Sequence, residues 1–151
     1  MGLFLSSPSN HRLNNNALKG LERLHRHMEK QSIDSPGAKK YGPYSAGVIA
    51  NGVIWLSGQI APEAGDDVQS QTSACLAKID GLLAATNLSK HDICFAQILL
   101  ADIDDFAAMN EIYGAWIQEV EVKPARAAFA AAGLPANARV EIVIQGIDNE
   151  S

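Results

Sequence analysis

The chain has 151 residues, of which 47% are hydrophobic and 19% are charged, a size and composition typical of one globular domain rather than of a disordered or collagenous protein. Its formal net charge of −5 is unevenly divided: residues 1–40 carry seven basic and three acidic residues, and the remaining chain carries five and fourteen. An acidic body repels a phosphate backbone, and no apolar run approaches the roughly 20 residues that span a bilayer, so we expect neither a nucleic-acid-binding nor a membrane protein.

Residues 1–40 form a polar, basic leader that we expect to be flexible or partly helical. A helix is predicted from Asn16 to about Gln31, followed by a loop at 35–37, where serine, proline and glycine are adjacent. We therefore place the folded domain at residues 41–148. The arginine-rich start of the leader loosely resembles a transit peptide, so organelle targeting is an alternative to the cytoplasmic location that we expect.

A β-hairpin is predicted at the start of the domain. Residues 46–50 and 53–57 are rich in β-branched and apolar side chains. Between these two runs lies Asn51-Gly52, a dipeptide that tolerates the positive φ angles of a type I′ turn.

Two helices and an intervening strand are predicted beyond the hairpin. The first helix begins at Asp66 or Asp67 as its N-cap and continues to about Thr86. The apolar run Ile93–Leu100 is too short for a typical buried helix and is predicted to be a buried strand. The second helix, capped by Asp104, carries apolar residues at steps of three and four from Phe106 to Val120.

Two further strands are predicted at 125–131 and 139–147. Alternation in the last strand places Val140, Ile142 and Ile144 against the helices and Arg139, Glu141, Val143 and Gln145 on the opposite face. The order β-β-α-β-α-β-β predicts an α+β fold in which two helices cover one face of a mixed sheet. We expect the other face to meet a second subunit, because it would otherwise expose apolar side chains.

Arg126 is the strongest candidate for a functional residue, because it lies in an apolar run where an unpaired guanidinium is costly. Three interpretations remain open: a fork for a small carboxylate ligand, an ion pair with Glu141 or another acid, and a side chain that reaches solvent. Glu141 is the matching acid, with the chemistry to hold or deprotonate a water molecule. Arg139 is a second candidate that we expect to be solvated.

The sequence lacks the motifs of nucleotide-binding and metal-binding sites. The glycines match no phosphate-binding loop, so no nucleotide cofactor is expected. His91 is the only histidine after residue 27 and is expected at the surface, which argues against a multi-histidine metal site. Cys75 and Cys94 lack metal-binding spacing and are expected to be buried free thiols, which favours a reducing compartment. We expect four aromatic residues in the core: Trp55, Phe106, Tyr113 and Trp116.

Six short motifs occur in order within the predicted domain. They are Tyr41–Ser45, Ser57–Ile60, Asp105-Phe106 with Asn110 and Tyr113, Pro124–Arg126, Leu134-Pro135 and Val140–Ile142. In this combination the chain resembles the reactive-intermediate deaminase (Rid) family, also called the YjgF family. The resemblance implies a chorismate-mutase-like fold assembled as a homotrimer, with ligand clefts between the subunits.

The resemblance also implies an activity. Rid enzymes hydrolyse reactive 2-imino acids of the 2-aminoacrylate and 2-iminopropanoate type to 2-oxo acids and ammonia, and they need no cofactor. By family position, Arg126 binds the substrate carboxylate, Glu141 is the catalytic residue beside the attacking water, Tyr44 and Ser57 line the cleft, and Gly58 and Asn110 shape it.

Two departures from the family pattern bear on substrate range. Ala127-Ala128 follow the arginine where many members carry a hydroxyl and then a thiol or small residue, and Ile142–Gln145 lack the second acidic residue that is common there. Three alternatives stay open: a deaminase of a larger, aminomuconate-like enamine, a non-enzymatic binding module for small carboxylates or a partner protein, and an endoribonuclease. The acidic body and the lack of a histidine pair disfavour the endoribonuclease.

Overall fold

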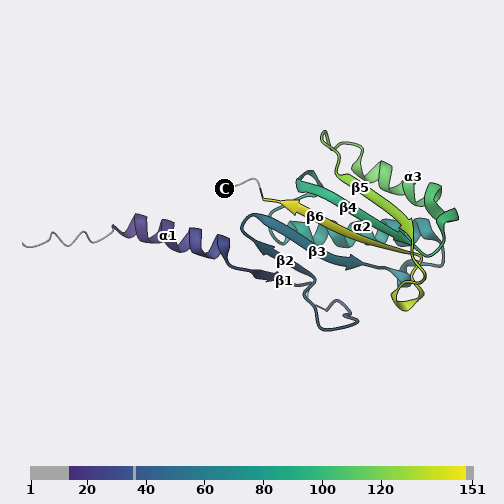
Figure 1. Cartoon of the computed structure of the whole chain (residues 1–151), viewed down its shortest axis with the longest axis horizontal. Helices are drawn as coiled ribbons and strands as arrows, with labels where there is room; N and C mark the ends of the chain where they lie inside the picture. Colours follow the sequence, from purple (N-terminus) through teal and green to yellow (C-terminus); the bar gives the residue numbers. More distant parts are fainter. Residues whose placement is uncertain (1–13, 36, 149–151) are drawn as a thin grey trace, which may run out of the picture.

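A computed structural model of the chain describes residues 14–35 and 37–148. They form three α-helices and one six-stranded sheet with the strand order β1-β2-β3-β6-β4-β5 (Figure 1). In chain order the elements are α1 (Asn15–Met28), β1 (Gln31–Ile33), β2 (Gly47–Ala50), β3 (Val53–Gln59), α2 (Val68–Ala84), β4 (Ile93–Leu100), α3 (Phe106–Ile117), β5 (Ala125–Ala130) and β6 (Val140–Ile147). Only β4 and β5 run parallel, so the predicted mixed sheet of an α+β fold is confirmed.

The hairpin of β2 and β3 forms as predicted, because Asn51 and Gly52 adopt the conformations that a two-residue turn needs. Their φ angles are 49° and 74°, left-handed values that asparagine and glycine tolerate. Strand β3 continues beyond its predicted end to Gln59, and its pairing with β6 shifts register between Leu56 and Gln59. This irregularity lies next to Gly58, one of the predicted site residues.

Helices α2 and α3 pack side by side against one face of the sheet, as predicted (Figure 1). The core between these layers is apolar and closed to solvent. Its most buried side chains, each at most 1% exposed, include Ile79 and Leu83 of α2, Met109 of α3, and Val140, Ile142 and Ile144 of β6. The alternation predicted for the last strand is therefore confirmed for its inward-facing residues.

The two helices begin in different ways. Asp67 caps α2 as predicted, because its carboxylate accepts a hydrogen bond from the backbone N–H of Ser70 at 2.8 Å. The prediction that Asp104 caps the second helix is wrong. A 3₁₀ turn over Ile103–Asp105 precedes α3, and the carboxylate of Asp102 accepts a hydrogen bond from the Asp104 N–H at 2.9 Å.

The N-terminal part of the described chain contains a strand that the sequence did not predict. Strand β1 pairs with β2, and its Ile33 side chain is only 4% exposed, so the sheet begins before residue 41. The division into a leader and a domain near residue 40 stays a prediction. Helix α1 begins one residue before its predicted start at Asn16, ends at Met28 rather than near Gln31, and projects from the sheet (Figure 1). Four of its apolar side chains are exposed: Leu18, Leu21, Leu24 and Met28.

Several side chains expected in the core lie instead at the surface. Trp55 of β3 is 40% exposed and Phe106 is 38% exposed, whereas Tyr113 is buried as expected. Cys75 is buried, and burial raises the pKa of its thiol to about 12, but Cys94 is exposed. Among the helices of the described residues, none is both long and apolar enough to cross a bilayer.

Candidate active site

Glu141, in β6, lines a cleft of about 390 Å³ together with Ser57 and Gly58, which lie near the end of β3. We call this the Glu141 cleft, and its walls are Tyr41, Gly42, Tyr44, Ser57, Gly58, Ile60, Pro135 and Glu141. Four of the six predicted site residues therefore come together here: Tyr44, Ser57, Gly58 and Glu141. Tyr41 and Pro135 are motif residues to which no role was assigned from the sequence, and the structure adds them to the cleft.

Gly58 leaves the space that the Glu141 side chain occupies. A Cβ atom at position 58 would lie 2.8 Å from Cδ and 2.9 Å from Cγ of Glu141, closer than such carbon atoms approach one another. The glycine is therefore required by the path of the glutamate side chain. This is a packing reason for the Ser57-Gly58 pair, and it supports the predicted role of Gly58 in shaping the site.

The Glu141 carboxylate is partly buried and accepts no hydrogen bond from a protein group within the described part of the chain. Loss of hydration disfavours the charged form of a carboxyl group, and this desolvation raises the pKa of Glu141 above its ordinary value. A carboxylate with a raised pKa is a stronger base than a solvated one. Glu141 is thus suited to accept a proton from a water molecule in the cleft.

Ser57 and Tyr44 shape the wall of the cleft through hydrogen bonds. The Ser57 hydroxyl donates to the carbonyl oxygen of Ser45 at 2.6 Å, which ties β3 to the segment that precedes β2. The Tyr44 hydroxyl oxygen accepts a bond from the Tyr41 N–H at 3.3 Å, across the turn that contains Gly42-Pro43. The Tyr44 bond thus closes the turn, the Ser57 bond fixes the end of this segment to β3, and the Ser57 hydroxyl proton is already engaged.

Arg126 and Asn110, the other two predicted site residues, form a second group. The Arg126 Nη1 atom donates to the Asn110 Oδ1 atom at 2.7 Å, and the guanidinium carbon lies 4.9 Å from the centroid of the Tyr113 ring. Phe106 lies on the same side, with its ring centroid 5.8 Å from that carbon. Arg126 has no acidic partner within 4.0 Å among the described residues, so most of its donors are available to an anion.

The two groups lie on opposite faces of the sheet. The strand pairing sets Arg126 opposite Ala96, and Ala96 opposite the buried Ile144, so Arg126 points to the helix side. Glu141 pairs with Leu99, three residues further along β4, and odd separation reverses the face of a strand. The ion pair between Arg126 and Glu141, one of the interpretations left open by the sequence, is therefore excluded within one chain.

The Arg139 side chain is 42% exposed, so it reaches solvent as expected, and it also has a structural role. It precedes β6, and its guanidinium forms a two-pronged ion pair with Asp105, with N–O distances of 3.0 and 3.2 Å. A further bond of 3.1 Å reaches the carbonyl oxygen of Asp66. Arg139 thus joins the segments that precede α2 and α3. In the described ranges, no group of three or more His, Cys, Asp or Glu residues is arranged to hold a metal ion.

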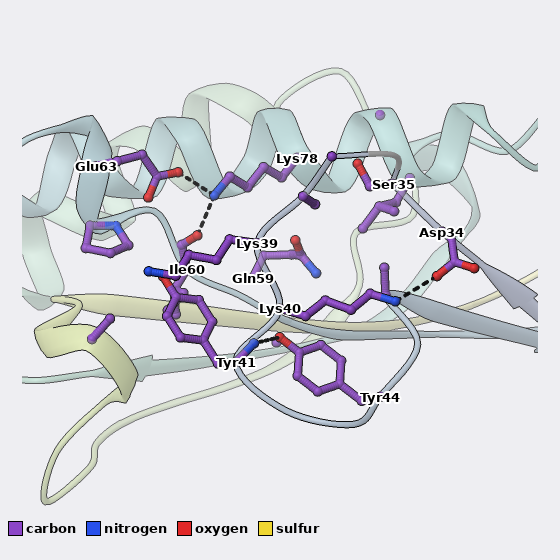
Figure 2. A pocket seen from close by; sticks show the side chains of 18 of the residues that line it. Asp34, Ser35, Lys39, Lys40, Tyr41, Tyr44, Gln59, Ile60, Glu63 and Lys78 are labelled. Atoms are coloured by element: carbon purple, nitrogen blue, oxygen red, sulfur yellow. Dashed lines mark hydrogen bonds and ion pairs between the residues drawn. The ribbon is translucent and has the colours of Figure 1, made fainter.

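A larger cavity, which the sequence did not predict, shares lining residues with the Glu141 cleft. Figure 2 shows the side chains that line it. Its volume is about 810 Å³, and it lies between residues 34–35 and 37–41 on one side and α2 on the other. We call it the lysine cavity, because Lys39, Lys40 and Lys78 all line it. A signal was present in the sequence, since Lys39 and Lys40 are adjacent at the point where the basic leader gives way to an acidic body.

Comparisons with known proteins agree with this architecture. The family model described as Endoribonuclease L-PSP matches residues 34–147. The mitochondrial protein mmf1 of Schizosaccharomyces pombe is 34% identical over 152 positions, covering 96% of this chain and 93% of that protein. A goat (Capra hircus) protein named 2-iminobutanoate/2-iminopropanoate deaminase is 37% identical over 107 positions, covering 67% of this chain and 77% of that protein. A crystal structure of a YjgF family member from Neisseria meningitidis has a TM-score of 0.72 at 35% identity and covers 83% of this chain and 99% of that one.

Proposed function

The chain belongs to the Rid family, also called the YjgF family, and from that premise we propose that it is an enamine/imine deaminase. Its substrates would be small reactive 2-imino acids of the 2-aminoacrylate and 2-iminopropanoate type, which it hydrolyses to 2-oxo acids and ammonia without a cofactor. The observation that carries the proposal is that two charged groups at the predicted positions, the Arg126 guanidinium and the desolvated Glu141 carboxylate, form no ion pair with any described residue.

Each charge has a defined task in this reaction. Arg126 holds the substrate carboxylate through paired N–H donors, and Asn110 fixes the guanidinium by accepting one of its hydrogen bonds. Glu141 takes a proton from water as the water oxygen bonds to C2 of the protonated imine. It then passes that proton to the nitrogen and takes the hydroxyl proton as the C–N bond breaks. The 2-oxo acid and ammonia leave, and Glu141 returns its proton to solvent.

Both residues reach one substrate only if two copies of the chain complete the site, because they lie on opposite faces of the sheet. We therefore propose a homotrimer in which the Arg126 group of one subunit faces the Glu141 cleft of the next. The exposed apolar side chains on the face away from the helices support this arrangement. Trp55 and Phe129 on that face are 40% and 43% exposed, and an interface would cover them.

A kinetic comparison tests the proposed activity. A serine dehydratase generates 2-aminoacrylate in situ, semicarbazide competes for it, and pyruvate release is followed with wild type, Arg126→Ala and Arg26→Ala. We expect wild type to accelerate hydrolysis and Arg126→Ala to lose roughly 10- to 100-fold in kcat/KM, because charge-assisted hydrogen bonds are lost. Arg26→Ala on α1 removes an equal charge and should keep full activity. No acceleration by wild type on any imino acid would refute the deaminase function.

The same measurement decides among the alternatives. A non-enzymatic binding module would bind 2-oxo acids, and its unfolding temperature would rise with them, without turnover. A deaminase of larger enamines would act on aminomuconate-like compounds and poorly on 2-aminoacrylate. The endoribonuclease description attached to the family model finds little support here, because the body after residue 40 is acidic and no histidine lines the Glu141 cleft.

The compartment is a separate proposal. The sequence favours the cytoplasm, but the match to mitochondrial mmf1 covers 96% of this chain and so extends into the leader. Helix α1 also presents apolar residues beside Lys19, Arg23 and Arg26, as basic amphipathic targeting helices do. Imaging of a C-terminal fluorescent fusion, with and without residues 1–30, distinguishes a cytoplasmic from a mitochondrial location. A diffuse signal from both forms supports the cytoplasm.

A further inference from the structure

The lysine cavity and the Glu141 cleft are neighbouring parts of one hollow. Tyr41, Tyr44, Gly58 and Ile60 line both, so the two spaces meet at these four residues. A cleft of about 390 Å³ already accommodates a three-carbon imino acid, and the second chamber adds about 810 Å³. If the substrate is only a three-carbon imino acid in the Glu141 cleft, the lysine cavity has no role in binding it.

The charges in the lysine cavity point to an anionic occupant. Lys40 is paired with Asp34 at 3.1 Å, and Lys78 with Glu63 at 2.6 Å (Figure 2). Lys39 differs, because in the part of the chain that the structure describes its ammonium group has no acidic partner within 4.0 Å. It lies 5.0 Å from the centroid of the Tyr41 ring, a contact that leaves its N–H donors free for a ligand.

The lining of the lysine cavity also suits the hydrocarbon part of a ligand that carries two carboxylates. Ile60 and Leu82 are apolar and buried, and Tyr41 and Tyr44 line both chambers. Methylene groups pack favourably against such surfaces. A lysine ammonium is a mobile point charge, so it pairs with a carboxylate at the end of a flexible chain without demanding one fixed geometry.

From these observations we propose that the lysine cavity extends the Glu141 cleft and selects 2-imino dicarboxylic acids, whose distal carboxylate pairs with Lys39. This inference rests on the proposed deaminase function for its chemistry. Hydrolysis at C2 is unchanged: water adds to the imine carbon and ammonia leaves, while the distal carboxylate stays ionised and only binds. Lys39 is accordingly a specificity-determining residue and takes no part in proton transfer.

Matched substrates of equal length test the selection. Amino-acid oxidases generate 2-iminoglutarate from glutamate and 2-iminopentanoate from norvaline, and semicarbazide trapping gives kcat/KM for each. We expect wild type to prefer 2-iminoglutarate. In Lys39→Gln the ratio of the two kcat/KM values should fall about three- to tenfold, as for loss of one partly screened ion pair, and the fall should shrink in about 0.5 M salt. In Lys19→Gln, which removes a lysine of α1, the ratio should stay constant. An unchanged ratio in Lys39→Gln would overturn the inference.

A binding measurement separates this inference from the proposed function. The unreactive products 2-oxoglutarate and 2-oxopentanoate are titrated into wild type and Lys39→Gln by calorimetry, with circular dichroism to confirm that the variant is folded. Tighter binding of 2-oxoglutarate that depends on Lys39 supports the lysine cavity as its site, even if no imino acid is hydrolysed and the deaminase function fails. Equal affinities, or no binding of either acid, reject the cavity's selectivity even if small imino acids are hydrolysed.

Discussion

Glu141 is partly buried without a hydrogen-bond donor among the described residues, and this burial raises the pKa of its carboxyl above the ordinary value of 4.5. The folded chain therefore binds this proton more tightly than the unfolded chain does. At neutral pH the ionised carboxylate lowers the free energy of unfolding, and this cost disappears as the pH falls through the raised pKa. The same group that activates water thus slightly destabilises the fold.

We predict that Glu141→Gln raises the unfolding temperature at pH 7 to 8 while it lowers kcat/KM by roughly 10²- to 10⁴-fold, the usual effect of removing a general base. The stability gain should shrink as the pH is lowered toward 4.5, and the acidic limb of the wild-type kcat/KM profile should lie above 4.5. Thermal unfolding followed by circular dichroism across this range checks the first part. A variant less stable than wild type at pH 8 would show that a partner stabilises the carboxylate.

Gly58 gives a second prediction at the scale of single atoms. In Gly58→Ala the new Cβ collides with the Glu141 side chain, so the carboxylate must move and kcat should fall at least about tenfold. Gly114→Ala is the matched control, because nothing lies within 4 Å of a Cβ at that exposed position of α3 and alanine favours a helix. Equal activity of the two variants would contradict the proposed fit between Gly58 and Glu141.

At the scale of elements, α1 and β1 differ in what they contribute to the fold. Helix α1 exposes its apolar residues, whereas β1 pairs with β2 and buries Ile33. Deleting residues 1–30 should therefore change the unfolding temperature by less than about 2 °C, while deleting 1–35 should lower it by roughly 5 to 10 °C, because one strand and a buried isoleucine are lost. Differential scanning calorimetry of both truncations decides this. A large loss on removal of 1–30 would mean that α1 packs in the folded protein.

Local signals explain which elements could be predicted from the sequence. Asn51-Gly52 and Asp67 act through their own backbone conformation or a neighbouring N–H, so the hairpin and the start of α2 followed from adjacent residues. Strand β1 is only three residues long and shows no alternation, and its position depends on pairing with β2, a tertiary contact. Asp104 failed as a cap because it lies inside a 3₁₀ turn that Asp102 caps, and this turn shifts the start of α3.

At the scale of the whole molecule, the candidate site likewise could be predicted from the sequence only in part. The family motifs predict six site residues, and the structure places four of them in the Glu141 cleft and two in the Arg126 group. Sequence alone left open an ion pair between Arg126 and Glu141, because periodicity assigns faces within one strand and says nothing about the register between strands. The pairing of β4 with β5 and β6 places the two residues on opposite faces of the sheet. One site can therefore contain both residues only if two chains assemble.

If each site takes Arg126 from one subunit and Glu141 from the next, two inactive variants should complement one another. Arg126→Ala and Glu141→Gln, unfolded together at equal amounts and refolded, assemble at random into heterologous rings, so about one quarter of all sites combine both native residues. We expect about a quarter of wild-type activity from the mixture and almost none from either variant refolded alone. Light scattering on the same samples should give the mass of three chains. A monomeric mass, or a mixture as inactive as its components, would disprove a shared site, because residues acting within one chain cannot be restored by a neighbour.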